Sequence, residues 1–230
     1  MVAEYQKDFI EFLLANNALR FGEFTLKSGR KSPYFINTGQ FYSGVALAKL
    51  ASFYAAALQQ NEKDDFTIIF GPAYKGIPLC VSLAYYYGQQ LNRRVCYLFD
   101  RKEAKVHGEF GADFRAQNYL VGKIPTEDDK VLLIDDVLTT GGTKYEAVEL
   151  LHKISDTVPL IGLIISVDRQ EVDQNGDSPV QLFYEKTNIP VISIITIETI
   201  ISYLKQKPEE FGPYLDSLME YRRQWGIPAA

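Results

Sequence analysis

Residues 131–143 constrain the fold of this chain more than any other segment. The segment begins with an apolar run, continues with two adjacent carboxylates, Asp135 and Asp136, and ends in a loop of threonines and glycines. In the next segment, 144–151, the apolar residues have the spacing of an amphipathic helix. This order predicts a buried strand, a loop at its carboxyl end and a helix that begins where the loop ends.

A loop in this position is suited to bind phosphate. The first N–H groups of a helix have no partners within it and lie at the positive end of the helix dipole. Gly141 and Gly142 allow close approach of the backbone, and the neighbouring threonines add hydroxyl donors. The acids suit ribose hydroxyls or a hydrated Mg²⁺ ion. The segment matches neither the Walker sequence G-x-x-x-x-G-K-S/T nor the dinucleotide sequence G-x-G-x-x-G.

The rest of the chain alternates between patterns of strands and helices. Apolar runs predict strands at residues 67–70, 94–99, 160–167 and 191–197, with shorter β-like runs at 24–26 and 34–36. Helices are predicted at residues 5–16, 45–58, 76–87 and 198–221. We expect Gly22 to mark the end of the first helical segment and Pro208 to interrupt the last. Strands that are apolar throughout indicate an α/β fold whose mostly parallel sheet is flanked by helices on both faces.

Composition narrows the class of protein. The chain has 230 residues, of which 47% are hydrophobic and 23% charged, and no linker is evident, so we expect one domain over residues 1–230. A net charge of −5 argues against a nucleic-acid partner. Cys80 and Cys96 lie in apolar runs and are expected to be buried thiols in a reducing compartment. Neither a signal peptide nor a membrane span is evident, which predicts a cytoplasmic protein with no membrane contact.

Three further loops should follow strands at the same edge of the sheet, where α/β proteins bind ligands. The loop 71–76 combines small residues with Lys75, which could neutralise a diphosphate, although an ordinary glycine turn is the alternative. The segment 100–111 carries several cations and a histidine among glycines, and it could close over a polyanion or be a solvated surface loop. Arg169 could bind a carboxylate through two hydrogen bonds or form a structural salt bridge with Asp168 or Glu171.

The β-like pair near the N-terminus offers two more candidates. Phe35 could cover a flat ring, and Lys27 could reach the polar edge of that ring. Core packing for Phe35 and a solvated charge for Lys27 are the alternatives. Because side chains alternate along a strand, Asp135 and Asp136 are expected to point in different directions.

Taken together, these motifs resemble the orotate phosphoribosyltransferase family. Residues 131–143 are similar to the phosphoribosyl pyrophosphate (PRPP) signature of type I phosphoribosyltransferases, and residues 24–35 and 101–109 point to the orotate branch. The resemblance implies the type I phosphoribosyltransferase fold with a small N-terminal α/β hood. This hood over the base would be built from about residues 1–42 and the C-terminal part of the chain. The implied reaction joins orotate to PRPP with Mg²⁺, releases pyrophosphate and forms orotidine 5′-monophosphate in pyrimidine synthesis.

The resemblance also implies roles for individual residues. The implied catalytic residues are Lys102, Lys105, His107, Asp135 and Asp136, with no proton transfer assigned to the two acids. The implied contacts of PRPP are Lys27, Tyr74, Lys75, Arg101, Lys102, Lys105, His107, Asp135, Asp136, Val137, Leu138, Thr139, Thr140, Gly141, Gly142 and Thr143. The implied contacts of orotate are Lys27, Phe35, Ile36, Thr139 and Arg169. Mg²⁺ would be held mainly through PRPP and water, near Asp135 and Asp136. The family forms homodimers, so Arg101 and Lys105 would act on the neighbouring subunit's site.

The chain departs from the family pattern at several positions. Thr140, Gly142 and Thr143 stand where the signature commonly has alanine, threonine and alanine, so one hydroxyl has moved along the loop. Phe110 replaces a glycine of the cationic loop, and Ile36 stands where an aromatic residue is common.

Three other functions are compatible with parts of the pattern. A phosphoribosyltransferase for another base is disfavoured by Arg169, which suits a carboxylated base. A PRPP-sensing regulatory protein is disfavoured because no helix-turn-helix segment is evident. A generic α/β scaffold without a PRPP site is disfavoured by the agreement between strand, acids, loop and helix. The C-terminal segment has no assigned role, but its apolar stripe is expected to pack on the body of the protein or on a partner chain; the stripe consists of Tyr214, Leu218, Tyr221 and Trp225.

Overall fold

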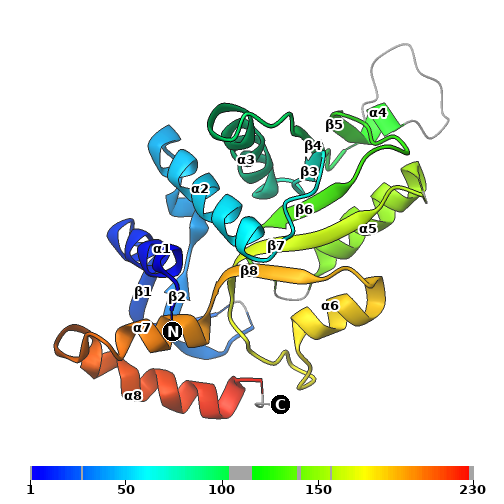
Figure 1. The fold of residues 1–230 in the computed structure, drawn as a ribbon. Helices are drawn as coiled ribbons and strands as arrows, with labels where there is room; N and C mark the ends of the chain where they lie inside the picture. Colours follow the sequence, from blue (N-terminus) through cyan, green and yellow to red (C-terminus); the bar gives the residue numbers. More distant parts are fainter. Residues whose placement is uncertain (1, 27, 104–115, 139–140, 156, 228–230) are drawn as a thin grey trace.

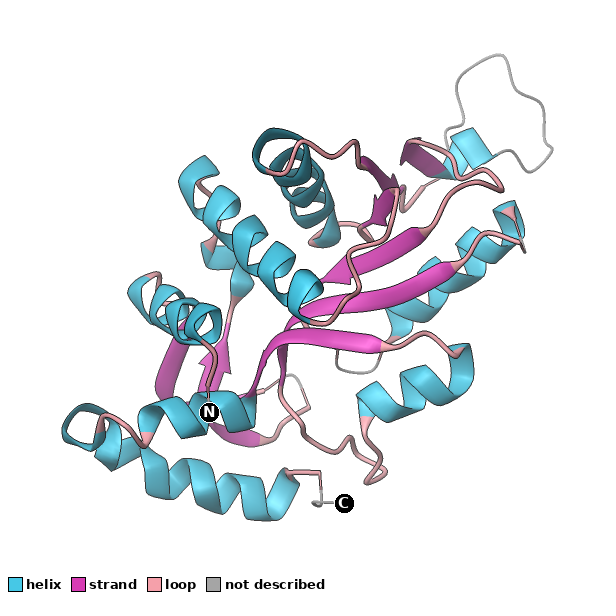
Figure 2. Ribbon diagram, in the orientation of Figure 1, coloured by secondary structure: helices cyan, strands magenta, loops and turns pink. Residues whose placement is uncertain are grey.

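The computed structural model of the protein describes residues 2–26, 28–103, 116–138, 141–155 and 157–227. Its centre is a six-stranded sheet with the order β5-β4-β3-β6-β7-β8, in which β5 alone runs antiparallel to its neighbour among the described strands. Figure 1 and Figure 2 show helices on both sides of this sheet. The predicted α/β fold with a mostly parallel, helix-flanked sheet is confirmed.

The elements follow one another along the chain in the predicted alternation. The strands are β1 (Leu19–Thr25), β2 (Lys31–Ile36), β3 (Ile68–Phe70), β4 (Cys96–Asp100), β5 (Leu120–Gly122), β6 (Val131–Asp135), β7 (Leu160–Asp168) and β8 (Val191–Thr196). The helices are α1 (Glu4–Ala15), η1 (Thr38–Gln40), α2 (Gly44–Gln60), α3 (Gly76–Gln90), α4 (Ala116–Tyr119), α5 (Gly142–Ile154), α6 (Pro179–Thr187), α7 (Ile197–Leu204) and α8 (Pro208–Trp225).

The strands are apolar throughout because the sheet is buried on both faces. Successive strand side chains point to opposite faces and join two different hydrophobic clusters. One face packs against α1, α2, α3, α7 and α8, and its strand residues include Ile69, Leu132, Ile134 and Ile164. The other face packs against α5 and α6, and its strand residues include Ile68, Phe70, Leu133 and Ile165.

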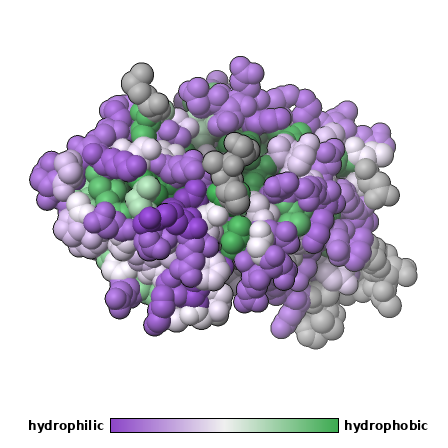
Figure 3. Space-filling model, turned by 90° about the horizontal axis from the view of Figure 1, so that it is seen from below, coloured by the Kyte–Doolittle hydropathy of each residue, from purple (hydrophilic) through white to green (hydrophobic). Residues whose placement is uncertain are grey.

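The two ends of the chain pack against one another beside this sheet. The hairpin β1–β2 lies against α8, where the ring of Phe21 is 5.2 Å from that of Tyr214 and Tyr34 is 6.0 Å from Tyr221. Leu218 is fully buried in the same cluster. The C-terminal apolar stripe therefore packs on the body of the protein. Figure 3 views this side and shows hydrophilic side chains with smaller apolar areas among them.

The sequence prediction differed from the structure at several boundaries. The first helix ends at Ala15, well before Gly22, because Asn17 adopts a left-handed conformation (φ 54°) that stops the helix. Gly22 instead lies inside β1, beside an irregularity in the pairing with β2. Four short or irregularly patterned elements among the described residues were not predicted: η1, α4, α6 and the edge strand β5. Cys80 is buried as expected, whereas Cys96 is only half-buried, and both are free.

The buried carboxylate of Asp129 stabilises the loop before β6 through several hydrogen bonds. Its oxygens accept hydrogen bonds from the Thr67 hydroxyl (2.7 Å) and from the backbone N–H and hydroxyl of Thr126 (2.9 and 2.8 Å), and it pairs with Lys123. Burial opposes ionisation, but these donors, led by Lys123, hold the pKa of Asp129 below its ordinary value.

Removing this carboxylate should therefore destabilise the protein. We expect Asp129→Ala to lower the free energy of unfolding by about 2 to 3 kcal/mol at neutral pH, because Thr67, Thr126 and Lys123 all lose the buried carboxylate that accepts their hydrogen bonds. The loss should shrink below about pH 4, where an unfolded aspartate is protonated and the stabilisation by the native carboxylate fades. Denaturant unfolding at several pH values measures this, with the exposed Asp65→Ala as the control. An Asp129→Ala effect that did not depend on pH would contradict this assignment.

Candidate active site

The carboxyl ends of β3, β6 and β7 bring the predicted loops to one edge of the sheet. The parallel register pairs Phe70 with Leu133 and Asp135 with Ile165, so these strands end side by side. The loop 71–76 and the acid pair of β6 therefore lie next to each other, as predicted.

Asp136 joins three parts of the chain. One carboxylate oxygen accepts hydrogen bonds from the ammonium group of Lys75 (2.7 Å) and the hydroxyl of Thr38 in η1 (2.9 Å). The other accepts the backbone N–H of Val137 (2.8 Å), and the backbone oxygen of Asp136 accepts both the N–H and the hydroxyl of Ser166. Asp136 is therefore held rigidly, and Lys75 is fixed at the mouth of the site.

Asp135 is paired with a different lysine. Its carboxylate binds the ammonium group of Lys144 in α5 and accepts the backbone N–H of Asp136 (2.8 Å). The hydroxyl of buried Tyr54 donates to the backbone oxygen of Asp135 (2.9 Å). The two acids have separate partners, as the alternation of side chains along a strand predicts.

The environments of the two acids push their pKa values apart. Burial raises the pKa of Asp135, and the nearby charge of Asp136 adds to this, so that the opposing effect of Lys144 is outweighed. Burial acts on Asp136 as well, but Lys75 and Thr38 outweigh it and lower the pKa of that carboxyl. Asp136 is therefore the acid that stays ionised most firmly.

The start of α5 is shaped for close approach of a ligand. Gly141, the residue before the helix, has a φ of 75°, and a Cβ atom there would lie 2.8 Å from the ring of Tyr145. Gly142 and Thr143 are exposed in the first turn, where backbone N–H groups have no partner within the helix. This is the geometry expected of an anion-binding helix start.

The loop 71–76 has the same requirement for small residues. A Cβ atom on Gly71 would lie 2.1 Å from the carbonyl oxygen of Gly76, so the two glycines pack backbone against backbone. The carboxylate of Asp100, at the end of β4, accepts the N–H of Ala73 (2.5 Å). The loop is thereby fixed between β3 and β4, with the side chains of Tyr74 and Lys75 largely exposed.

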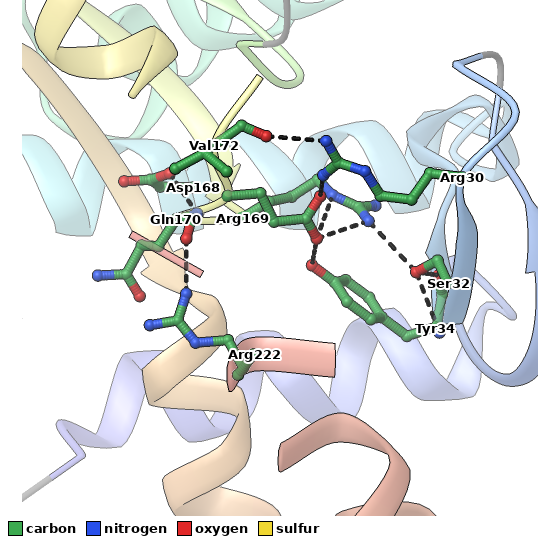
Figure 4. A network of polar contacts seen from close by, with 9 residues as sticks. Arg30, Ser32, Tyr34, Asp168, Arg169, Gln170, Val172 and Arg222 are labelled. Carbon is green, nitrogen blue, oxygen red and sulfur yellow. Dashed lines mark hydrogen bonds and ion pairs between the residues drawn. The ribbon is translucent and has the colours of Figure 1, made fainter. Parts of the chain in front are cut away.

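Arg169 directly follows β7. Its side chain belongs to a cluster of polar residues that also includes Glu171, and Figure 4 shows this cluster. Its guanidinium donates two hydrogen bonds to one oxygen of Glu171 (3.1 and 2.8 Å) and lies 4.3 Å from the centre of the Tyr34 ring. The salt bridge that the sequence left open is therefore formed. The cluster lies beside β2, which also carries Phe35 and Ile36.

The acid pair suits a magnesium ion carried by a ligand better than one bound directly. Each carboxylate oxygen of Asp135 and Asp136 already accepts a hydrogen bond or an ion pair from the protein. Within the described part of the chain there is no cluster of three metal-ligating side chains. These residues fit a hydrated ion that a polyphosphate and water hold.

Comparisons with known proteins agree with this geometry. Residues 37–188 match the model of the phosphoribosyl transferase domain. The chain is 45% identical to the orotate phosphoribosyltransferase of Yersinia enterocolitica over 97% of this chain and 99% of that protein. It is 43% identical to the enzyme of the same name from Nitrosococcus oceani, over 97% and 96% of the two chains. The crystal structure of the Francisella tularensis orotate phosphoribosyltransferase superposes with a TM-score of 0.80 at 39% identity, covering 95% and 99% of the chains. The chain belongs to the orotate phosphoribosyltransferase family.

Membership makes the protein a pentosyltransferase, as the sequence predicted. Orotate phosphoribosyltransferases transfer phosphoribose from PRPP to orotate in pyrimidine biosynthesis. No helix among the described residues is long and apolar enough to cross a membrane.

The structure brings some of the predicted site residues of this orotate phosphoribosyltransferase together. Asp135 and Asp136 share the sheet edge with Lys75, and Lys102 lies 3.8 Å from Asp100 and 3.6 Å from Glu146 of α5. Arg101 is exposed and its backbone N–H bonds to Tyr119. Val137 directly follows Asp136 in the chain. The side chain of Leu138 is buried in the hydrophobic cluster that packs against α5 and α6. The predicted residues that lie outside the described part of the chain are Lys27, Lys105, His107, Thr139 and Thr140.

Two of the predicted orotate contacts, Phe35 and Ile36, lie on β2. The Phe35 ring stacks on Phe24 (5.5 Å), with the Arg20 guanidinium 5.5 Å from its centre, so one part of Phe35 is already covered. Ile36 packs against the large hydrophobic cluster. Both side chains are half-buried.

Sequence reasoning missed several residues that position the site. Thr38, Tyr54 and Ser166 lie far from residues 131–143 in the sequence, and no local pattern pointed to them. Lys144 could have been found, because it falls three, four and seven residues before the buried side chains of α5, which are Ala147, Val148 and Leu151. A lysine at such a position calls for a buried partner.

Proposed function

We propose that this protein catalyses the transfer of the 5-phosphoribosyl group from PRPP to orotate through the residues described above. The observation that carries the proposal is the sheet edge at which Asp135 and Asp136, each with its own lysine, meet the start of α5 and the loop 71–76. Such an edge offers donors for a phosphate, acceptors for ribose hydroxyls and a cation for a diphosphate.

In this proposal each loop has a distinct task. The loop after β6 and the first residues of α5, residues 137–143, bind the 5′-phosphate, and the acid pair lies beside the ribose. Lys75 and Tyr74 contact the pyrophosphate, together with Lys102 and, from outside the described residues, Lys27, Lys105 and His107. Arg169, Phe35, Ile36 and Thr139 hold orotate.

The reaction needs charge stabilisation and orientation. The bond between the anomeric carbon and the pyrophosphate oxygen breaks as the orotate ring nitrogen bonds to that carbon. Lys75 and the cationic loop stabilise the negative charge on the departing pyrophosphate. The acids hold the ribosyl group, whose anomeric centre becomes positive, and Arg169 orients orotate against it. Mg²⁺ bound with PRPP would add further charge neutralisation on the leaving group.

Three further parts of the proposal rest on the family. The protein would act as a cytoplasmic homodimer in which Arg101 and Lys105 serve the neighbouring site. The chain would be one domain over residues 1–230. Its hood, built from about residues 1–42 and the C-terminal part, is supported by the packing of β1–β2 on α8.

Arg169→Ala should change the KM for orotate much more than the KM for PRPP. We expect the KM for orotate to rise about ten- to a hundredfold, while the KM for PRPP changes by about twofold or less, because the orotate carboxylate loses the cation that binds it. Steady-state kinetics with each substrate varied in turn measure both constants. Equal losses for both substrates would remove Arg169 from the base site.

A panel of bases tests the proposed substrate. Purified protein with PRPP and Mg²⁺ should consume orotate and leave uracil, adenine and hypoxanthine unchanged. Consumption of another base in preference to orotate would assign a different phosphoribosyltransferase reaction. PRPP-dependent thermal stabilisation without turnover of any base would favour a regulatory role.

A further inference from the structure

The carboxylate of Glu171 contacts Arg169, Tyr34 and Arg30, so its position does not depend on Arg169 alone. Figure 4 labels these three partners. One oxygen of Glu171 accepts the hydroxyl of Tyr34 at 2.6 Å as well as the two donors of Arg169. The other oxygen lies 3.4 Å from the guanidinium of Arg30. Because two other residues hold this carboxylate, it is a fixed anchor for the arginine.

Glu171 leaves part of the Arg169 guanidinium available. The contacts with Glu171 use Nε and Nη2, which form one edge of the planar group. Nη2 also donates to the hydroxyl of Ser32 at 3.4 Å, whereas Nη1 has no hydrogen-bond partner in the described part of the chain. In the cluster of Arg30, Arg169 and Glu171 the direct contacts involve two positive charges and one negative charge. The cluster therefore has one guanidinium nitrogen without a partner and one positive charge in excess, which suits a carboxylate ligand.

The C-terminal segment holds the loop that carries Glu171. The N–H of Val172 bonds to the backbone oxygen of Trp225, and the N–H of Ile227 bonds to that of Gln170, both at 2.9 Å. This pairing places Glu171 opposite Gly226 in an antiparallel bridge. The guanidinium of Arg222 in α8 donates to the same oxygen of Gln170 at 2.6 Å. These hydrogen bonds therefore hold the loop 170–172 against residues 222–227.

Arg30 completes the connection from the side of the hood. Its guanidinium lies 4.0 Å from the centre of the Trp225 ring and donates to the backbone oxygen of Val172 at 3.0 Å. Trp225 therefore holds Arg30, which in turn contacts the Glu171 carboxylate. Residues near the N-terminus and after β7 therefore meet at one carboxylate, and Trp225 near the C-terminus contacts one of them, Arg30.

We propose that Glu171 is a positioning residue that aligns Arg169 with the carboxylate of the base, and that Trp225 acts on the same alignment by holding Arg30. This inference rests on the proposed function, because it takes Arg169 as the group that binds orotate. It also gives the C-terminal segment a role in the affinity for the base.

Glu171→Gln tests the proposal, because the substitution keeps the shape of the side chain and removes its charge. The KM for orotate should rise about tenfold, and the KM for PRPP should stay within about twofold of that of the parent protein. Trp225→Ala should shift the KM for orotate in the same direction by a smaller factor. Arg223→Ala, an exposed neighbour on α8, is the control and should change neither constant.

The double variant Glu171→Gln/Trp225→Ala separates a shared pathway from two independent effects. If Trp225 acts through Glu171, the double variant should resemble Glu171→Gln alone. If the two substitutions multiply each other's effect on the KM for orotate in the double variant, the proposed role of Trp225 is overturned. If Glu171→Gln raises the KM for orotate and the KM for PRPP equally, the proposed role of Glu171 is overturned. If Glu171→Gln does not fold, Tyr34→Phe removes the 2.6 Å hydrogen bond and should raise the KM for orotate selectively.

The parent protein distinguishes this inference from the proposed function. Turnover of orotate by the parent, with no selective effect in these variants, would overturn only the positioning role. Absence of orotate turnover in the folded parent would overturn both.

Discussion

Lys144→Met should lower the free energy of unfolding by about 3 to 5 kcal/mol at neutral pH, because it leaves the buried carboxylate of Asp135 without its cation. The Asp135 side chain is 7% exposed and that of Lys144 is 10% exposed, so water replaces little of the lost interaction. Since Asp135 also lies in the proposed ribose site, turnover should fall as well. Denaturant unfolding followed by circular dichroism measures the change in stability.

The effect of Lys144→Met should depend on pH in a defined direction. Burial already raises the pKa of Asp135, and loss of Lys144 should raise it further. The folded variant would then bind a proton more tightly than the unfolded chain, so its stability should fall as the pH rises through the raised pKa. The deficit should be larger at pH 8 than at about pH 5.

Two variants control this experiment. Lys153→Met makes the same substitution at an exposed position near the end of α5 and should change stability little. Asp135→Asn/Lys144→Met removes both charges of the pair and should recover most of the lost stability. A Lys144→Met deficit no larger than that of Lys153→Met would show that the buried pair is energetically unimportant.

Gly71→Ala should disable the loop 71–76. The new Cβ would lie 2.1 Å from the carbonyl oxygen of Gly76 and 2.9 Å from the Cβ of Cys80, so the backbone has to move. We expect a loss of about 3 kcal/mol in stability and about a hundredfold in turnover, because Lys75 is displaced with the loop. Thermal unfolding and steady-state kinetics measure these effects.

Gly88→Ala is the matched control for Gly71→Ala. Gly88 lies in α3, and a Cβ there would have no atom within 4 Å. Because alanine favours a helix over glycine, this variant should gain about 0.5 to 1 kcal/mol and keep its activity. Similar behaviour of the two variants would contradict the backbone contact between Gly71 and Gly76.

The sequence predicted the sheet because its strands carry the pattern of burial on both faces. The run ending at Asp135 and the helix after it follow local rules, and both were found. The edge strand β5 was missed because it has three residues and no periodic pattern. The predicted helix 5–16 agrees with α1 to within one residue at each end, but its stop is Asn17 with a positive φ of 54° and not the more distant Gly22.

The predicted proximity of candidate residues agrees with the structure where these residues lie in loops that end neighbouring parallel strands. The acid pair and Lys75 belong to recognisable loops, so their meeting follows from the parallel strand order. The contact of Thr38 with Asp136 joins residues 98 positions apart, and that of Tyr34 with Glu171 joins residues 137 apart. Such contacts depend on how β2 and η1 pack beside the large sheet, which local patterns do not specify.

The most direct test of the proposed reaction is the loss of orotate absorbance in purified protein supplied with PRPP and Mg²⁺. Orotate should disappear only when protein, PRPP and Mg²⁺ are all present, and pyrophosphate and orotidine 5′-monophosphate should form in equal amounts. Absence of both turnover and PRPP-dependent stabilisation in folded protein would contradict the function assigned to residues 135–143.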